Sequence, residues 1–340
     1  QIYPDPPARL GGEGSAADAL LALLASPNIA SKRFVFEQYD PIVGSRTIRR
    51  PQSADAAVLL LEADGGSGAL AISIDGNGRR VACDPYTGAA EAVLECARNL
   101  ACVGAEPLGL TNCLNFGNPE KPQIAWQLTR AVEGLRDACL ALGVPVVGGN
   151  VSLYNEGGDG PIYPTPIVGM VGKLPDPELV PWVGFAEEGH AIALVGMFEP
   201  ALAGSELEKL RGRLGEALPP IDLPAHADAL VRVRAAVRGG ELPTAHDVSE
   251  GGLACALAEC CIEGGRGARV SLDGGEGALF GEGPGGVIVA GPRAAVESIE
   301  GAIVLGEVGG DTLEIEGALS VPVGDLRAAF EGAVPAALGS

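Results

Sequence analysis

Residues 145–158 read PVVGGNVSLYNEGG, in which an apolar run meets two glycines, an asparagine and, two residues later, a serine. Gly148 and Gly149 allow a positive φ angle or a close approach of the backbone to a ligand. Asn150 offers a carbonyl oxygen to a hard cation such as Mg²⁺, and Ser152 offers a hydroxyl to a phosphate. The composition of the stretch therefore suits either a ligand site or a plain turn.

The predicted elements around this stretch help to decide between a ligand site and a plain turn. A strand is predicted at 144–148, so the motif lies at its end, and a second turn-like group at 154–156 follows where one turn would suffice. Upstream, a helix is predicted from Asn118 as the N-cap, with Pro119 at its first position, to Gly143. Its apolar stripe contains Ile124, Leu128, Val132, Leu135, Cys139 and Leu142.

Two further polar stretches are predicted as loops next to strands. Residues 111–119, TNCLNFGNP, include Asn112 and Asn115, which the helix cap does not need and which suit nucleotide edges or a metal. Residues 75–88, DGNGRRVACDPYTG, favour an ordinary loop, although a helix beginning near Thr87 could bind an anion. Together with the first stretch, these loops predict a phosphate or nucleotide ligand with Mg²⁺ but leave the reaction open.

The remaining candidate motifs favour structural roles. In AHDVSEGG, residues 245–252, Ser249 is expected to cap the next helix and His246 to be a hydrogen-bonded histidine. His190 and His226 are interpreted as surface or boundary residues. The G-x-G-x-x-G at 281–286 precedes a strand instead of following one, so it is a chance match, and there is no P-loop, H-E-x-x-H or G-x-S-x-G motif.

Length and composition indicate two Ala/Val/Leu-rich domains. The chain has 340 residues, 47% of them hydrophobic, and a formal charge of −21, which argues against nucleic-acid or anionic-membrane partners. No apolar run reaches the roughly 18 residues that a membrane span needs. The eight cysteines include no C-x-x-C pair and are expected to be reduced core thiols of a cytoplasmic protein. The chain begins with Gln1 instead of Met, so it is expected to be a piece of a longer protein or a processed protein.

Periodicity predicts the other elements. Strands are expected at 55–61 and 69–74, as a hairpin around the turn 64–68, and at 107–110, 167–172, 191–195 and 285–290. Helices are expected at 16–25, 88–103, 224–238, from about 250, and at 292–301. The Pro- and acid-rich stretch 173–189 is the expected domain boundary, which gives a lead-in at 1–50 and domains at 51–175 and 186–335.

Long stretches of the chain resemble phosphoribosylformylglycinamidine synthase, the synthetase of purine biosynthesis. The resemblance runs from about residue 20 to the end and matches the second half of that subunit. The residues that carry it are PNIASKRFVFEQYD (27–40), the run from DGNGRR to FGNPEKP (75–122), PVVGGNVSLYNE (145–156), PTPIVGMVG (164–172) and AHDVSEGGLACALAE (245–259).

The resemblance implies a fold and a reaction. The fold is an aminoimidazole-ribonucleotide-synthase-like α+β unit, whose amino-terminal four-stranded sheet pairs into a barrel with its counterpart in the other half, followed by a carboxy-terminal α/β domain. The reaction uses ATP and Mg²⁺ to phosphorylate the amide oxygen of formylglycinamide ribonucleotide. Ammonia from a glutaminase subunit then displaces the phosphate, because phosphorylation turns a poor leaving group into a good one.

The resemblance also implies roles for single residues. Gly149 matches an ATP-contacting glycine, Asn150 a Mg²⁺-ligating asparagine and Ser152 a substrate-contacting serine. Asn112 stands where the family often has an ATP-contacting Asp, so the charge of that contact is missing. The catalytic histidines belong to the first half; at the equivalent place, 73–77, this chain has no histidine, and no catalytic residue is expected on it.

Partners and alternatives follow from the same resemblance. The expected partners are the first half of the same subunit, the glutaminase subunit and a small accessory subunit. One alternative is a related ATP-using enzyme, such as aminoimidazole ribonucleotide synthase, selenophosphate synthetase or a hydrogenase-maturation protein; the Asn-Phe-Gly-Asn run at 115–118 argues against these. The other is a non-catalytic scaffold half that binds a structural nucleotide and partner subunits.

Overall fold

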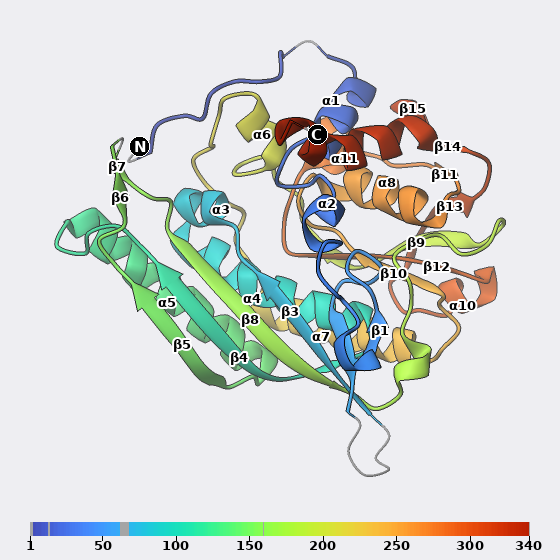
Figure 1. Ribbon diagram of the computed structural model, residues 1–340, viewed down its shortest axis with the longest axis horizontal. Helices are drawn as coiled ribbons and strands as arrows, with labels where there is room; N and C mark the ends of the chain where they lie inside the picture. Colours follow the sequence, from blue (N-terminus) through green and yellow to red (C-terminus); the bar gives the residue numbers. More distant parts are fainter. Residues whose placement is uncertain (1–2, 13, 62–67, 159, 340) are drawn as a thin grey trace.

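The computed structural model describes residues 3–12, 14–61, 68–158 and 160–339, and it contains two large mixed sheets with helices packed between and around them (Figure 1). The first sheet has the strand order β1-β2-β3-β8-β4-β5. Its strands are β1 Thr47–Arg49, β2 Ala57–Leu60, β3 Ala69–Asp75, β4 Glu106–Asn115, β5 Val146–Ser152 and β8 Thr165–Leu174. A small separate ribbon pairs β6 Glu156–Gly157 with β7 Gly160–Pro161.

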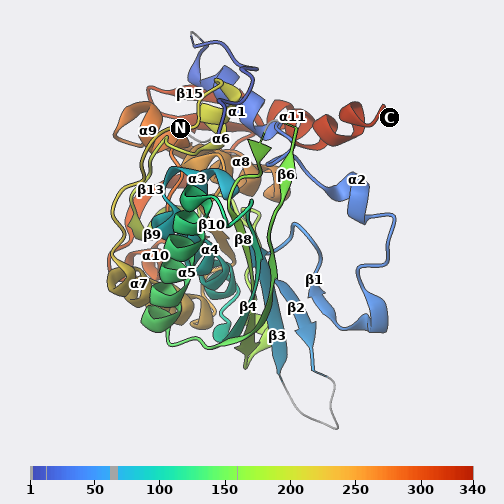
Figure 2. The same cartoon turned by 90° about the vertical axis from the view of Figure 1, so that its left-hand side faces the viewer.

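The first sheet is covered by helices on one face only. Helix α4 (Pro85–Cys102) packs on β3 and β8, and α5 (Pro122–Leu142) packs along α4. Figure 2 shows these helices on one side of the sheet, with the other face turned away from them. On that uncovered face Ile74 is 70% exposed, whereas its strand neighbour Ser73 is buried. The alternation is that of a sheet buried on one side.

The second sheet has the order β10-β12-β9-β13-β11-β14-β15. Its strands are β9 Ala191–Phe198, β10 Thr244–Asp247, β11 Ala268–Val270, β12 Gly285–Gly291, β13 Ile303–Val308, β14 Thr312–Ile315 and β15 Leu319–Pro322. The remaining helices are α1 Ala16–Leu24, α2 Arg33–Phe36, α3 Gly78–Cys83, α6 Glu206–Leu210, α7 Leu223–Arg238, α8 Gly252–Gly264, α9 Gly275–Phe280, α10 Arg293–Glu297 and α11 Val323–Ala337, with short 3-10 turns at Val43–Ser45 and Pro177–Leu179.

Helix α4 connects the two sheets. It contacts β3 and β8 of the first sheet, and also α7, β10 and β12 of the second unit. Sixteen of its 18 residues are buried, and small side chains such as Ala90, Ala97 and Cys96 allow neighbours on every side to approach. Helices α1, α8 and α11 form a second apolar cluster. Six of the eight cysteines are buried, as expected of core thiols.

Most of the periodic predictions are confirmed. The structure contains the β2–β3 hairpin, the helices predicted at 16–25, 88–103 and 224–238, and Gly143 as a left-handed C-cap with φ 66°. The turn predicted at 64–68 falls largely outside the described residues. Within the described ranges, no helix combines the length and apolar character needed to cross a membrane.

Several local predictions are wrong. The first sheet has six strands instead of four, because the short strands β1 and β2 extend it. Strand β4 continues through the predicted loop to Asn115, and the Gly-Gly-Asn-x-Ser motif lies inside β5 instead of after it. Both stretches are polar, but each finds a hydrogen-bonding neighbour strand, which overrides local preference.

The predicted helix caps also need correction. Helix α5 begins at Pro122, and Asn118 instead accepts a hydrogen bond from the Glu120 amide in the turn before it. Val132 on the predicted apolar stripe is exposed. The stretch 75–88 contains helix α3 instead of an ordinary loop. Helix α8 has Gly251 as its N-cap and no side-chain cap, so Ser249 does not have the predicted role.

Candidate functional site

The four residues that the resemblance singles out lie on two adjacent parallel strands. In the β4–β5 register, Asn112 is opposite Gly149, Cys113 is opposite Asn150, and Asn115 is opposite Ser152. Strand β5 is the edge of the sheet, and its residues are exposed except for the half-buried Ser152. Helix α5 is the crossover between the two strands, as a parallel pair requires. The structure therefore brings all four residues together at one edge.

The strand alternation divides the four residues between the two faces of the sheet. Asn112 is opposite the buried Val168 of β8, so Asn112 and Gly149 share the face that α4 covers. Asn150 and Ser152 are offset by one residue and share the uncovered face with Cys113 and Asn115. Residues predicted to contact the nucleotide thus lie across the sheet from those predicted to contact the metal and the substrate.

Gly149 is required for the fit of Asn112. A Cβ atom at position 149 would lie 2.6 Å from Asn112 Oδ1 and 2.7 Å from Asn112 O, which is closer than real contacts permit. A Cβ atom at Gly148 would meet only Thr111 Oγ1, at 3.8 Å. The two adjacent glycines therefore have different roles, and only Gly149 is sterically constrained.

The end of β5 is held by side-chain amides. Asn155 Nδ2 donates to Ser152 O at 2.9 Å, to Ser152 Oγ at 3.1 Å and to Phe116 O at 3.1 Å. Asn115 Nδ2 donates to Thr165 O at 3.0 Å and to Cys113 O at 3.1 Å. These bonds join β5 to the chain after β4, and β4 to β8. The Asn-rich composition of 111–119 and 145–158 thus has a local structural purpose.

A second group of polar residues lies between β3, α4 and the second sheet, and its Asp75 is level with Asn112 in the sheet, because both residues are opposite Val168 of β8. Arg98 of α4 is 1% exposed and donates two hydrogen bonds to Asp247 Oδ2, from Nε at 3.2 Å and from Nη2 at 3.0 Å. Its Nη2 lies 3.6 Å from Glu95. Asp75 accepts a hydrogen bond of 3.0 Å from Asn99 Nδ2. Three carboxyl groups therefore surround one guanidinium in the interior.

Burial and mutual repulsion alter the titration of these carboxyl groups. Burial, followed by the charges of Glu250 and Asp247, raises the pKa of Asp75 to about 8. Burial and the neighbouring Asp75 raise the pKa of Glu95 well above its ordinary value. Burial also raises the pKa of Asp247 to about 6, although Arg98 opposes the shift. A carboxyl cluster with raised pKa values is chemically suited to exchange protons for a cation.

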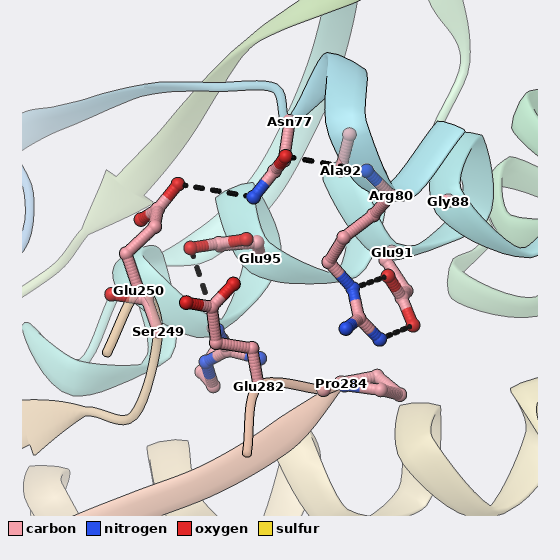
Figure 3. A pocket seen from close by; sticks show the side chains of 12 residues that line it. Asn77, Arg80, Gly88, Glu91, Ala92, Glu95, Ser249, Glu250, Glu282 and Pro284 are labelled. Atoms are coloured by element: carbon pink, nitrogen blue, oxygen red, sulfur yellow. Dashed lines mark hydrogen bonds and ion pairs between the residues drawn. The ribbon is translucent and has the colours of Figure 1, made fainter. Parts of the chain in front are cut away.

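The pocket next to this cluster is lined by charged groups from both units (Figure 3). Arg80 pairs with Glu91 through two hydrogen bonds of 2.5 and 2.7 Å, and Asn77 Nδ2 donates to Glu250 at 3.4 Å. Glu282 Oε1 accepts 2.8 Å hydrogen bonds from the amides of Glu206 and Gly251. Its Oε2 is buried without a partner among the described residues. Burial raises the pKa of Glu282 to about 7.

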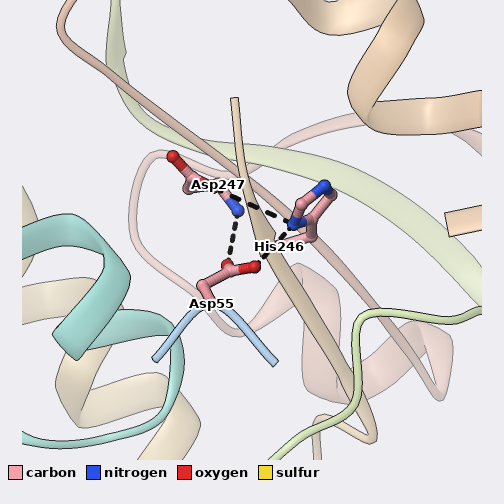
Figure 4. A group of neighbouring side chains, drawn as sticks. All are labelled: Asp55, His246 and Asp247. Atoms are coloured by element: carbon pink, nitrogen blue, oxygen red, sulfur yellow. Dashed lines mark hydrogen bonds and ion pairs between the residues drawn. The ribbon is translucent and has the colours of Figure 1, made fainter. Parts of the chain in front are cut away.

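His246 lies in an adjoining acidic cluster that shares Asp247 with the Arg98 group and joins β10 to the segment before β2 (Figure 4). Its Nδ1 lies 2.7 Å from Asp55 Oδ1 and its Nε2 lies 3.1 Å from Glu259 Oε2. Burial alone lowers the pKa of His246, but Asp55 and then Glu259 outweigh it and raise the pKa well above its ordinary value. Both ring nitrogens therefore donate, which confirms the prediction of a hydrogen-bonded histidine.

The same cluster has the donor set of a metal site. Asp55, His246 and Asp247 each place one possible ligand atom within 4.8 Å of the other two. Because the charged imidazole pairs with Asp55 and the Arg98 guanidinium pairs with Asp247, ion pairs account for the arrangement. His226, in contrast, is 2% exposed on α7, and burial lowers its pKa. The prediction that it lies at the surface is wrong.

Several of the polar residues in the interior had no distinguishing signal in the sequence. Asn77 and Asp84 accept hydrogen bonds from the first turns of α3 and α4, which confirms only their local preference for turns. Glu95 lies on a helix that is buried over most of its length, and Glu282 lies within the G-x-G-x-x-G stretch at 281–286, which precedes a strand. Glu95 and Asn99 are spaced i, i+4 and therefore lie on one face of the helix. This spacing of two polar residues was the one sign in the sequence that this face of α4 meets a polar neighbour, which is Asp75.

Two family models match the chain in succession. The N-terminal domain of AIR synthase related proteins matches residues 53–174, and the C-terminal domain of the same proteins matches residues 187–314. The chain is 48% identical over 347 aligned residues to phosphoribosylformylglycinamidine synthase subunit PurL of Anaeromyxobacter sp. (strain Fw109-5), an alignment covering 94% of this chain and 45% of that protein. The chain thus spans less than half the length of this relative.

Another relative and two solved structures are also PurL subunits. The PurL subunit of Moorella thermoacetica is 51% identical over 254 residues, which cover 74% of this chain and 34% of that protein. The structure described as T. maritima PurL complexed with ATP has a TM-score of 0.59 and 27% identity, over 82% of this chain and 40% of that chain. T. maritima PurL complexed with FGAR has a TM-score of 0.73 at 18% identity, over 95% of this chain and 55% of that one, which supports the fold. The chain belongs to the AIR synthase related family and is homologous over most of its length to phosphoribosylformylglycinamidine synthase subunit PurL.

Proposed function

We propose that this chain is the carboxy-terminal half of the synthetase that converts formylglycinamide ribonucleotide and ammonia to formylglycinamidine ribonucleotide, with consumption of ATP. The observation that carries the proposal is the placement of Asn150 and Ser152 on one face of β5, with Asn112 opposite Gly149 on the other face, within a chain about 45–50% identical to PurL subunits. The reaction needs a cation and a hold on the substrate at one place, and Asn150 and Ser152 share the uncovered face of the sheet. These two side chains have the chemistry for these roles.

The donor set fits Mg²⁺ and ATP. The Asn150 side chain is exposed on β5, and no hydrogen bond among the described residues uses it, so its Oδ1 is available as a ligand to a hard cation. The cation would offset charge on the transferred phosphoryl group. Asn112 and Gly149 would contact ATP, and Ser152 would donate its hydroxyl to the substrate. Asn112 can accept or donate a hydrogen bond there but cannot supply a negative charge.

The first half of the same subunit is the partner that this proposal requires. The uncovered face of the first sheet carries Asn150 and Ser152 on β5 and, three strands away on β3, the exposed Ile74. We propose that this face closes into a barrel with the equivalent sheet of the first half, which would supply the catalytic histidine. A glutaminase subunit and a small accessory subunit would deliver ammonia. One solved relative is described as PurLQS from Thermotoga maritima. The proposed location is the cytoplasm.

Reconstitution tests the proposal. This chain is mixed with the first half, ammonium chloride, Mg-ATP and formylglycinamide ribonucleotide, and amidine formation and ADP release are measured. Neither half alone should turn over. Asn150→Ala and Ser152→Ala should each lower the rate at least tenfold, and Gln123→Ala, an exposed residue of α5 away from both strands, is the matched control. Full activity of both strand variants would rule out the assigned site.

A second candidate function is a scaffold half that binds a structural nucleotide. The pocket between the two units supports it, because Asp75, Glu95 and Glu282 are carboxyl groups held in the interior next to Arg80 and Asn77. Such a site would bind a nucleotide through a cation. Calorimetry of the chain with Mg-ATP separates the two candidates. Binding that Glu95→Gln abolishes and Asn150→Ala leaves intact favours the scaffold, and the reverse pattern favours the catalytic half.

A further inference from the structure

Asn155 makes an unusual set of contacts for a residue just outside a strand. Its Nδ2 donates to Ser152 O, Ser152 Oγ and Phe116 O at 2.9, 3.1 and 3.1 Å, and its Oδ1 lies 3.3 Å from Ser152 Oγ. Its own amide N–H donates to Phe116 O at 3.1 Å. One carboxamide therefore contacts both the backbone and the hydroxyl of Ser152, and the chain that follows β4.

The backbone between the two residues is bent to allow this contact. Tyr154 has φ 60°, a left-handed conformation that residues other than glycine adopt rarely. Its N–H donates to Gly117 O at 3.1 Å, and Phe116 N–H donates to Ser152 O at 3.0 Å. The reversal at Tyr154 returns the chain over the end of β5. As a result, the Asn155 side chain faces Ser152 instead of solvent.

We propose that Asn155 is a positioning residue that holds the Ser152 hydroxyl in the orientation that meets the substrate. A serine hydroxyl on an edge strand can otherwise adopt three rotamers, and the Asn155 N–H bond to Oγ selects one. Because the Oγ–Oδ1 contact is long at 3.3 Å, the hydroxyl proton can exchange it for an oxygen of the substrate. The inference rests on the proposed function, in which Ser152 contacts formylglycinamide ribonucleotide.

The neighbouring asparagine Asn118 provides a matched control. Its Oδ1 accepts a hydrogen bond from the Glu120 amide at 2.8 Å, and among the described residues no hydrogen bond joins its side chain to Ser152. It lies in the segment between β4 and α5, so Asn118→Ala disturbs a local turn without touching the hydroxyl. A role for Asn155 in loop structure alone would make Asn155→Ala and Asn118→Ala behave alike.

The experiment is a double-mutant cycle in the full synthetase subunit, with ammonia as the nitrogen source and saturating Mg-ATP. Asn155→Ala should lower kcat/KM for the ribonucleotide by about tenfold, the size expected for one polar contact, and leave the KM for ATP unchanged. Ser152→Ala should cause an equal or larger loss. The double variant should be no worse than Ser152→Ala, because Asn155 acts through that hydroxyl.

The remaining outcomes separate failure of this inference from failure of the proposed function. If Ser152→Ala lowers activity and Asn155→Ala adds an independent loss, Asn155 has a structural role and the inference fails while the proposed function stands. If Ser152→Ala has no effect, the proposed site and the inference fail together. Asn155→Asp, which keeps the shape but loses the N–H donors, serves in the same cycle if the alanine variant does not fold. If the Asn155→Asp variant is as active as the wild type, the inference is also overturned.

Discussion

At the scale of single residues, Gly149 shows how a polar motif can be fixed by sterics. The strand β5 could accept a larger residue at Gly148, but Gly149 lies against the Asn112 amide. The Gly-Gly pair therefore has one constrained member and one free member. Packing against Asn112 constrains this residue, so a substitution at Gly149 will alter folding; under the proposed function it would also alter nucleotide binding.

We expect Gly149→Ala to destabilise the chain by about 1–3 kcal/mol, because the new methyl group forces Asn112 and its strand to shift. Gly148→Ala should change the unfolding free energy much less, since its Cβ has room. Urea denaturation followed by circular dichroism measures both. Equal losses for the two variants would show that the close approach of Asn112 is not the cause.

Glu282 makes the stability depend on pH. Burial raises its pKa in the folded state to about 7, above the ordinary value of about 4.3 in the unfolded chain. The folded state thus binds this proton more tightly, and the stabilisation is fully present below about pH 4 and is lost as pH rises through 7. Glu282→Gln mimics the protonated form. Relative to wild type, this variant should become more stable with rising pH, by on the order of 3 kcal/mol between pH 4 and 8.

Urea titrations of wild type and Glu282→Gln at several pH values test this difference. A difference in unfolding free energy that stays constant from pH 4 to 8 would mean that Glu282 titrates as it does in the unfolded chain. A difference of the opposite sign would mean that its charged form is the one stabilised by Arg79, which opposes the shift.

At the scale of elements, the sequence predicts the helices whose apolar spacing is periodic. It misses the strand ends that are determined by pairing with a neighbouring strand. Helices 16–25 and 224–238 are correct because their apolar spacing is local information. The ends of β4 and β5 are wrong because Asn112 and Asn150 look like turn residues, and only the parallel pairing of the two strands makes them extended. The resemblance found the candidate site, whereas composition alone left a turn possible.

The buried polar group could not be predicted for a related reason. Arg98 and Glu95 lie on α4, whose apolar spacing predicts a core helix. Their partner Asp247 lies about 150 positions later along the chain and comes from the second sheet. A single sequence carries no sign that these positions meet. The ion pair joins α4 to β10 and is therefore a property of how the elements assemble.

Arg98→Leu should destabilise the chain by about 3–5 kcal/mol, because it leaves Asp247 and Glu95 in the interior without a counter-charge. The loss should be smaller at pH 5 than at pH 8, since both carboxyl groups have raised pKa values and can be protonated. The exposed pair of Arg269 and Glu314 provides the control, with Arg269→Leu costing about 1 kcal/mol or less. Urea unfolding at both pH values measures the effect, and similar costs for the two variants would contradict it.

At the scale of the whole molecule, one face of the first sheet remains uncovered while α4 is buried between the two sheets. Burial on one side is normal for an antiparallel sheet whose other face meets water, but water-facing positions are then usually polar. Here the uncovered face carries Ile74, which is 70% exposed. An exposed isoleucine at this position fits the proposed contact with another protein surface. The proposed barrel with the first half of the subunit supplies that surface.

Replacement of Ile74 by lysine should weaken assembly with the first half and leave the chain itself folded. The side chain is already exposed, so the cost to stability should be within about 1 kcal/mol, whereas a lysine inside a closed barrel would lose its hydration. Leu140→Lys is the matched control, since Leu140 is 72% exposed on α5, away from the sheet face. Light scattering of mixed halves measures assembly and thermal unfolding measures stability. Normal assembly of Ile74→Lys, or equal loss in both variants, would place the contact elsewhere.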